Sequence, residues 1–163
     1  MQLHKETVVL EPLIDDLIEK FRLKTHKPVE FSKAFHHCNS VYADAFCLRE
    51  ILSNLIDNAI KYSGESVQIK ISSSASTDGY THISVTDNGM GIPLKEQGKI
   101  FEKFERASAV IRNRKEGASG FGLGLNYVLH VVEAHHGSVK LESIEGEYSK
   151  FTINIPQHNG ETA

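Results

Sequence analysis

Apolar and polar residues alternate along the chain with two different periods, one typical of helices and one typical of strands. From Pro12 onwards, apolar residues recur every three or four positions, which predicts an amphipathic helix with Pro12 in its first turn. A longer helix is expected from Asp44, whose carboxylate can cap the first turn, to Tyr62, where a Ser-Gly pair breaks the pattern. A third helix is expected to run through residues 125–132 and to end at Gly137. The apolar stripe of the first helix comprises Leu13, Ile14, Leu17, Ile18 and Phe21.

Strand patterns fill much of the remaining chain. Residues 67–71 and 83–85 alternate between apolar and polar positions, and Asp78-Gly79 lies in the turn between them, which predicts a β-hairpin. Further strands are expected at 29–31, 41–42, 139–142 and 151–155. Several helices combined with a mostly antiparallel run of strands predict an α+β fold. We expect a two-layer α/β sandwich in which helices cover one face of a mixed, mostly antiparallel sheet.

The composition limits the classes of protein to which the chain can belong. Its 163 residues are enough for one domain, and 40% apolar with 24% charged residues is ordinary for a globular protein. A formal charge of −3 predicts no nucleic-acid partner, and no apolar run approaches the about 18 residues of a membrane span. Cys38 and Cys47 form neither a disulfide framework nor a CxxC site. We therefore expect a cytoplasmic domain without direct membrane contact, and leave open whether a longer parent protein is anchored in the inner membrane.

The long helix contains polar residues at unusual positions. In SNLIDNAIKYS, residues 53–63, the side chains of Asn54, Asn58 and Lys61 fall beside the apolar arc of the helix, and Tyr62 falls near its edge. An asparagine carbonyl can bind Mg²⁺ without adding charge, lysine can contact phosphate, and tyrosine offers a face to a base. The stretch taken alone is equally consistent with an ordinary amphipathic helix that carries two half-exposed asparagines.

Two glycine-containing stretches add to this pattern. In TDNGMGIP, residues 86–93, an acid follows a strand and precedes Gly-x-Gly, which allows close approach of a ligand to the backbone; such a stretch is also a common turn. In GFGLGL, residues 120–125, glycines open a helix, and the N–H groups at a helix N-terminus suit a phosphate. This second stretch is neither a P-loop nor a dinucleotide motif, and by itself it is weak support for a phosphate site.

The order of the motifs is more specific than any one of them. The asparagine helix, DNGMGIP, IFEKFERAS (residues 100–108) and GFGLGL follow one another within about 75 residues. This series resembles the N box, first glycine box, phenylalanine box and second glycine box of the catalytic, ATP-binding domain of sensor histidine kinases, in the GHKL superfamily. The resemblance covers roughly residues 8–156 and implies a Bergerat-type α/β sandwich. It implies a catalytic domain at 8–157, a remnant of a preceding dimerisation-domain helix or linker at 1–7, and a tail at 158–163.

The resemblance also implies roles for individual residues. Asn58 is the implied Mg²⁺ ligand, with Asn54 assisting near the phosphates, and Arg106 would approach the γ-phosphate. Asp87 would accept a hydrogen bond from the adenine amino group, which selects ATP over GTP. Ser149 is a candidate for a water-bridged contact to adenine. The implied catalytic residues are Asn54, Asn58 and Arg106, and the implied nucleotide contacts are Asn54, Asn58, Lys61, Tyr62, Asp87, Gly89, Gly91, Ile92, Gly120, Phe121, Gly122, Leu123 and Gly124.

Other positions qualify this picture. Phe121 stands where most relatives have a small residue, so its ring could press on the ribose or on the lid, which is expected at Ser108–Ser119. Phe101 and Phe104 are equally consistent with anchoring that lid and with core packing. No carboxylate stands at the position of Asn54, which in related ATPases is a glutamate that activates water, so the resemblance favours phosphoryl transfer over rapid hydrolysis.

The expected function is transfer of the ATP γ-phosphoryl group, with Mg²⁺, to a histidine on a dimerisation domain absent from this chain, and onward signalling to a response regulator. None of the 9 histidines lies in a segment resembling His-Glu-x-x-x-Pro. The pairs His36-His37 and His135-His136 lack a spaced third metal ligand and are expected at the surface. Alternatives are a degenerate ATP-binding regulatory module and an anti-sigma-type serine kinase.

Overall fold

A computed structural model describes residues 2–98, 100 and 121–158, with residues 121–123 described by their backbone only. The elements, in chain order, are β1 (Lys5–Val9), α1 (Leu10–Lys24), β2 (Val29–Phe35), β3 (Ser40–Asp44), α2 (Ala45–Lys61), β4 (Val67–Ala75), β5 (Tyr80–Asp87), α3 (Leu94–Gln97), α5 (Phe121–Ala134), β6 (Ser138–Ile144) and β7 (Tyr148–Pro156).

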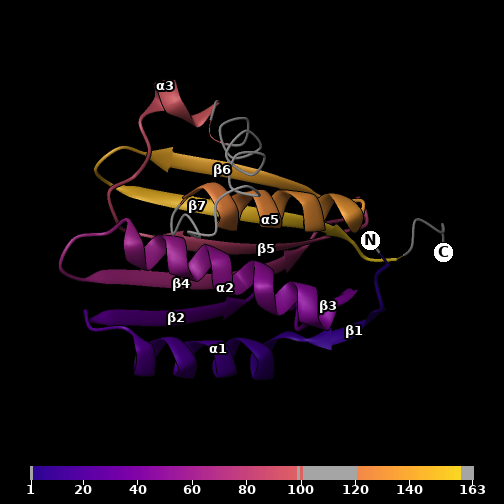
Figure 1. Cartoon of the computed structure of the whole chain (residues 1–163). Helices are drawn as coiled ribbons and strands as arrows, with labels where there is room; N and C mark the ends of the chain where they lie inside the picture. Colours follow the sequence, from indigo (N-terminus) through magenta and orange to yellow (C-terminus); the bar gives the residue numbers. More distant parts are fainter. Residues whose placement is uncertain (1, 99, 101–120, 159–163) are drawn as a thin grey trace.

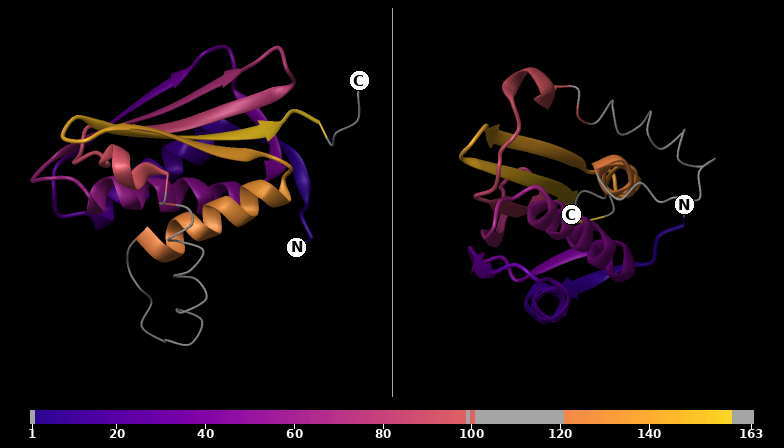
Figure 2. Two further views of the ribbon diagram at one scale, coloured as in Figure 1. Left: turned by 90° about the horizontal axis from the view of Figure 1, so that it is seen from above. Right: turned by 60° about the vertical axis from the view of Figure 1, so that its left-hand side comes forward.

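Five strands form one sheet in the order β2-β4-β5-β7-β6, and β1 pairs with β3 in a separate two-stranded sheet. Within the larger sheet, β2 and β4 are parallel and the other neighbouring strands are antiparallel. Helices α1, α2 and α5 lie together on one face of this sheet (Figures 1 and 2). The predicted α+β class and two-layer arrangement are therefore confirmed.

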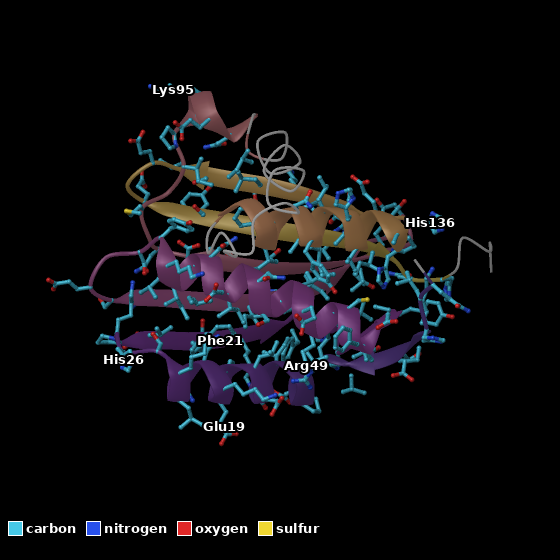
Figure 3. All side chains as sticks on the ribbon, viewed as in Figure 1. Glu19, Phe21, His26, Arg49, Lys95 and His136 are labelled. Atoms are coloured by element: carbon cyan, nitrogen blue, oxygen red, sulfur yellow. The ribbon has the colours of Figure 1, made fainter. Side chains whose placement is uncertain are left out.

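Helix α1 shows how the sequence period produces this packing. All five residues of the predicted stripe are buried, and Phe21 points towards the interior while Glu19 points away from it (Figure 3). Arg49 of α2 lies between the two helices and forms an ion pair with Asp16 of α1. Burial of this stripe stabilises the packing of α1, because each large apolar side chain removed from water contributes about 1.5 to 3 kcal/mol.

Helix α2 begins and ends where the sequence predicts. Asp44 is its N-cap, and the Asp44 Oδ1 atom accepts a hydrogen bond from the Cys47 N–H at 3.0 Å. The helix ends at Lys61, with Tyr62 as its C-cap. Its apolar face is buried between the sheet and α5, and comprises Cys47, Leu48, Ile51, Leu52, Leu55, Ile56, Ala59 and Ile60.

The hairpin of β4 and β5 positions Asp87, the first residue of the DNGMGIP stretch. Gly79 in the connecting turn has a φ of +91°, a conformation that glycine adopts without strain. The register pairs Ile71 with Val85, which leaves Asp87 as the last residue of β5, opposite Ser149 of β7. Within the part of the chain that the structure describes, no helix is long and apolar enough to cross a membrane.

Two parts of the structure differ from the sequence expectation. Residues 5–7, expected within a preceding helix or linker, belong to β1. Helix α5 ends at Ala134 rather than Gly137, because His136 takes the left-handed conformation, with a φ of +62°, and closes the helix end. Gly137 is needed for a different reason, since a Cβ there would lie 2.1 Å from the Asn154 carbonyl oxygen.

The histidine pairs also differ from one another. His36, His37 and His136 are exposed, as expected. The expectation for His135 is wrong: its side chain is only 2% exposed. Its ring lies between the backbone of α5 and the first residue before α2, where it accepts a hydrogen bond from the Asp44 N–H at 3.1 Å.

Candidate functional site

A cleft opens between the second half of α2 and the strands β5 and β7. It contains about 390 Å³ of space between atoms, a figure that includes solvent at its open mouth. Its lining residues are Leu55, Asn58, Ala59, Tyr62, Val85, Asp87, Gly91, Ile92, Ser149 and Phe151. The structure thus brings together residues from the predicted asparagine helix and the first glycine box, although they are far apart in the sequence.

Four lining residues are absent from the sequence prediction: Leu55, Ala59, Val85 and Phe151. All four are apolar, and the sequence gives them no feature that separates them from core residues. The spacing does contain a signal, because Leu55 lies three residues before Asn58 and Val85 lies two before Asp87, on the same faces of their elements. These side chains give the cleft an apolar wall suited to a flat ring.

Asp87 is the buried acid of the cleft. Its side chain accepts a hydrogen bond from the Gly89 N–H at 2.9 Å, and the residue is 8% exposed. Burial raises the pKa of Asp87 to about 6, and the Gly89 hydrogen bond only partly opposes this shift. A carboxylate held in this way is a strong acceptor for a donor that enters the cleft, because apolar surroundings leave it poorly solvated.

Asn58 presents a second polar group with incomplete pairing. The residue is 7% exposed, and its Nδ2 atom is buried without a hydrogen-bond partner among the described residues. Buried polar groups in native structures are usually paired, so this amide has capacity for a ligand. Asn54 lies one turn earlier and is half-buried.

Asn54 connects the asparagine helix to the second glycine box. A Cβ on Gly124 would lie 3.4 Å from the Asn54 Oδ1 atom, so the start of α5 lies directly beside this part of α2. The sequence placed these two motifs about 70 residues apart, and only the packing of α2 against α5 brings them together.

Lys61 and Tyr62 complete the end of α2. The Lys61 Nζ atom forms an ion pair with the Asp57 Oδ2 atom at 3.0 Å, one turn earlier in the helix. Tyr62 lines the cleft, and its carbonyl accepts a hydrogen bond from the Met90 N–H at 3.2 Å. The loop after β5 is therefore attached to the end of α2.

The glycines of this loop are required by close approach to other parts of the protein. Gly91 has a φ of +67°, and a Cβ there would lie 2.2 Å from the Ile144 carbonyl oxygen of β6. A Cβ on Gly89 would lie 2.9 Å from the Tyr62 carbonyl oxygen. On the other side of Gly91, the Ile92 N–H donates to the Ser143 Oγ atom at 2.8 Å. The loop is thereby fixed against α2 and β6, with Ile92 buried in the cleft wall.

Several predicted site residues cannot be placed. Phe101, Phe104, Arg106, the lid Ser108–Ser119 and Gly120 lie outside the described residues. Phe121, Gly122 and Leu123 belong to the helical backbone at the start of α5.

The residues present fit a magnesium ion that arrives with a phosphate ligand. Within the described ranges, no group of three His, Cys, Asp or Glu side chains could hold a metal ion. The Nδ2 atom of Asn58, which has no partner among the described residues, is a hydrogen-bond donor suited to a phosphate oxygen. The Oδ1 atom of the same neutral amide is the one that can bind a metal ion. Mg²⁺ prefers oxygen ligands and keeps several waters, so one amide oxygen together with phosphate oxygens is a sufficient set.

Comparison with known proteins agrees with this geometry. Residues 43–159, more than half of the chain, match the family described as histidine kinase-, DNA gyrase B-, and HSP90-like ATPase. The adaptive-response sensory kinase SasA of Crocosphaera subtropica is 34% identical over 158 residues, which cover 96% of this chain and 40% of that protein. The chain thus spans about 40% of the length of this curated relative.

Solved structures show the same arrangement. The nucleotide-free catalytic domain of the histidine kinase ThkA has a TM-score of 0.77 and 27% identity, with coverage of 96% of this chain and 98% of that one. Full-length ShkA in complex with AMPPNP has a TM-score of 0.78 and 28% identity, covering 96% of this chain and 32% of that one. ThkA in complex with the response regulator protein TrrA has a TM-score of 0.74 and 25% identity, covering 97% of this chain and 43% of that one.

The matched family, the similar kinases and the cleft with its buried acid and buried asparagine agree with one another. This chain belongs to the histidine kinase-, DNA gyrase B-, and HSP90-like ATPase family, and within that family it is similar to the catalytic domains of sensor histidine kinases.

Proposed function

We propose that the domain binds Mg·ATP in this cleft and transfers the γ-phosphoryl group to a histidine on a dimerisation domain of its parent kinase. The observation that carries the proposal is that one apolar cleft is lined both by a buried acid, Asp87, and by an amide that lacks a hydrogen-bond partner among the described residues, Asn58. The first suits the amino group of adenine, and the second suits the phosphate end of the nucleotide.

Each side chain has a distinct part in binding. Asp87 accepts from the adenine amino group, Ile92 and Tyr62 lie against the base or ribose, and Ser149 bridges to adenine through water. Asn58 and Asn54 hold the metal and the phosphates, and Lys61 contacts phosphate by releasing or sharing Asp57. Bound Mg²⁺ supplies positive charge that offsets the charge on the phosphate oxygens.

The glycines from Gly120 to Gly124 cradle the phosphates at the start of α5, and Arg106 approaches the transferred group. In the transfer step, a bond forms between the imidazole nitrogen and the γ-phosphorus. The bond from that phosphorus to the β–γ bridging oxygen breaks, and ADP leaves with the electron pair. Asn54 is a neutral amide, so the site offers no carboxylate there to activate water in competition with the histidine.

The domain would act in the cytoplasm, and the phosphorylated histidine would in turn supply a response regulator. Support for this partner comes from the solved complex of ThkA, a similar kinase, with the response regulator protein TrrA.

Phosphotransfer in trans tests the proposal. The chain is mixed with labelled Mg·ATP and a separately expressed dimerisation domain that contains the acceptor histidine. Acid-labile, base-stable label on that domain is the expected result. Acid-stable phosphoserine would support the anti-sigma-type serine kinase instead, and ATP binding without any transfer would support a regulatory module. A variant of the acceptor domain without its histidine is the matched control.

A further inference from the structure

Lys27 lies outside every predicted motif, in the connection between α1 and β2. This short segment is held at both ends: the Thr25 N–H donates to the Phe21 carbonyl at 2.9 Å, and the Pro28 carbonyl accepts from the Val67 N–H at 3.1 Å. Figure 1 shows the connection at the same end of the molecule as the C-terminus of α2. Lys27 is therefore placed by a fixed backbone.

The ammonium group of Lys27 is engaged with the end of α2. Its Nζ atom donates to the Ile60 carbonyl at 2.6 Å, to the Ser63 Oγ atom at 3.0 Å and to the Gly64 carbonyl at 3.0 Å. The last carbonyls of a helix have no partner within the helix, and they carry partial negative charge. Of the three acceptors, the Ile60 carbonyl belongs to the last turn of α2 and also accepts a hydrogen bond from the Ser63 hydroxyl at 2.7 Å, while Ser63 and Gly64 follow the helix. Lys27 thus connects the end of α2 to the next residues and favours one conformation of the chain that leaves the helix.

The segment that Lys27 holds is also the support of the first glycine loop. Between Ile60 and Gly64 lies Tyr62, whose carbonyl accepts the Met90 N–H at 3.2 Å. A Cβ on Gly89 would lie 2.9 Å from that carbonyl oxygen and 3.3 Å from the Ser63 Cβ atom. The Gly89 N–H donates in turn to the Asp87 carboxylate at 2.9 Å.

We propose that Lys27 is a positioning residue for the adenine end of the nucleotide site. It touches neither the base nor the phosphates. It fixes residues 60–64, against which the loop containing Gly89 and Met90 packs, and thereby fixes the Asp87 carboxylate and the Tyr62 ring relative to each other. This inference rests on the proposed nucleotide function of the cleft.

Substitution Lys27→Met removes the ammonium group and keeps the apolar stem. We expect the Kd for ATP to rise about five- to tenfold, because Asp87 loses part of its orientation while its own charge is retained. We expect the preference for ATP over GTP to fall as well, since the base end of the site is affected. Lys27→Arg keeps the charge and several donors and should restore most of the affinity. Lys70→Met, an exposed lysine on β4, is the matched control and should match the wild type.

Amide exchange separates positioning from a general loss of stability. Without nucleotide, the Met90 N–H should exchange faster in Lys27→Met than in the wild type, while the Ile71 N–H in the centre of the sheet should keep its protection. Unchanged ATP affinity in Lys27→Met would overturn the inference, as would weaker affinity with unchanged Met90 exchange, or equal losses in Lys70→Met. If Lys27→Met does not fold, Lys27→Gln is subjected to the same comparison and the same criteria.

The two proposals fail in different ways. A wild-type chain that binds no ATP would overturn the proposed function, whatever Lys27 does. A wild-type chain that binds ATP, with a Lys27→Met variant that binds it equally well, would overturn only the positioning role.

Discussion

Asp87 and Asn58 are polar residues that the fold buries without fully satisfying them. Among the described residues, Asp87 accepts a hydrogen bond from Gly89 and the Nδ2 atom of Asn58 has no partner, and burial raises the pKa of Asp87. Either arrangement lowers the stability of the empty protein, because a buried polar group without a partner costs about 1 to 3 kcal/mol. Such departures from good packing are expected where a ligand completes the pairing.

Asp87→Asn should therefore weaken nucleotide binding. The amide can present its N–H₂ group towards the adenine amino group, where a donor meets a donor, and the lost hydrogen bond is worth about 2 to 3 kcal/mol. We expect the Kd for ATP to rise by one to two orders of magnitude, measured by calorimetry at pH 8. Asp78→Asn, in the exposed β4–β5 turn, is the control. Unchanged ATP affinity in Asp87→Asn would remove the assigned base pocket.

The same substitution should stabilise the protein without nucleotide at neutral pH. Burial raises the folded-state pKa of Asp87 to about 6, from an ordinary value of 3.8, so the native state binds more protons than the unfolded state between these values. Its contribution is thus favourable below about pH 4 and is lost as the pH rises through 6. Replacing the charge with an amide should raise the free energy of unfolding by about 1 to 3 kcal/mol above pH 7 and by little near pH 4. Urea unfolding across this pH range measures the difference, and a difference independent of pH would contradict the burial of the charge.

Asn58→Ala tests the metal role. The alanine removes an amide whose Nδ2 atom has no hydrogen-bond partner in the described part of the chain, so we expect little loss of stability. ATP affinity in EDTA should stay near the wild-type value, and the increase in affinity on addition of Mg²⁺ should disappear. Titrations with and without Mg²⁺ that shift equally would show that Asn58 is not a metal ligand.

At the scale of elements, the sequence predicted those features that depend on neighbouring residues. The N-cap at Asp44, the end of α2 at Tyr62 and the turn at Gly79 depend on interactions within a few residues, and each is confirmed. The periods of α1 and β4 are local in the same sense, because one apolar face repeats along each element. The order of the motifs along the chain then identified the polar residues of the cleft, Asn58 and Asp87.

Several features that depend on particular contacts between distant residues were not predicted. Strand β1 exists because it pairs with β3, about 35 residues later, and its sequence has no strong strand pattern. The sequence predicted His135 at the surface, but the fold places its ring against the Asp44 backbone. The apolar lining of the cleft, including Phe151, consists of the same residue types as the core. Its residues can be told from core residues only once the fold shows which of them border the cleft.

Gly91 is a residue at which a distant part of the chain leaves no room for a side chain, and its substitution tests that restriction. Its φ is +67°, and the Ile144 carbonyl oxygen lies 2.2 Å from the position that a Cβ would take, so both features exclude a side chain. Gly91→Ala should therefore lower the free energy of unfolding by at least about 1 to 3 kcal/mol and displace the loop that carries Ile92. Gly98→Ala is the matched control, because Gly98 has a φ of −71° and nothing lies within 4 Å of its Cβ position. Equal thermal stability of the two variants would mean that the loop can move away from β6.

At the scale of the whole molecule, α2 and α5 meet at two junctions. At the first, Asn54 in the middle of α2 lies beside Gly124 near the start of α5. At the second, Asp44 accepts the His4 N–H at 2.9 Å and donates its own N–H to His135, which follows the last residue of α5. The entering chain, α2 and α5 are thus connected through one buried residue. Burial opposes ionisation of Asp44, but the His4 and Cys47 N–H groups prevail and lower the pKa of its carboxyl.

His135→Leu tests whether this second junction stabilises the fold independently of the nucleotide site. The His135 ring is buried, its Nε2 atom accepts the Asp44 N–H, and its Nδ1 atom lies 2.8 Å from the Val131 carbonyl oxygen. Since Nε2 accepts, the proton lies on Nδ1 and the ring is neutral. Leucine has a comparable volume and leaves the Asp44 N–H buried without a partner, which should lower the free energy of unfolding by about 1 to 3 kcal/mol. The Kd for ATP, measured well below the melting temperature, should stay unchanged because the cleft lies at the other ends of both helices.

His130→Leu, at an exposed position of α5, controls for the loss of an imidazole. Loss of ATP binding in a fully folded His135→Leu variant would show instead that the two junctions are coupled through the helices.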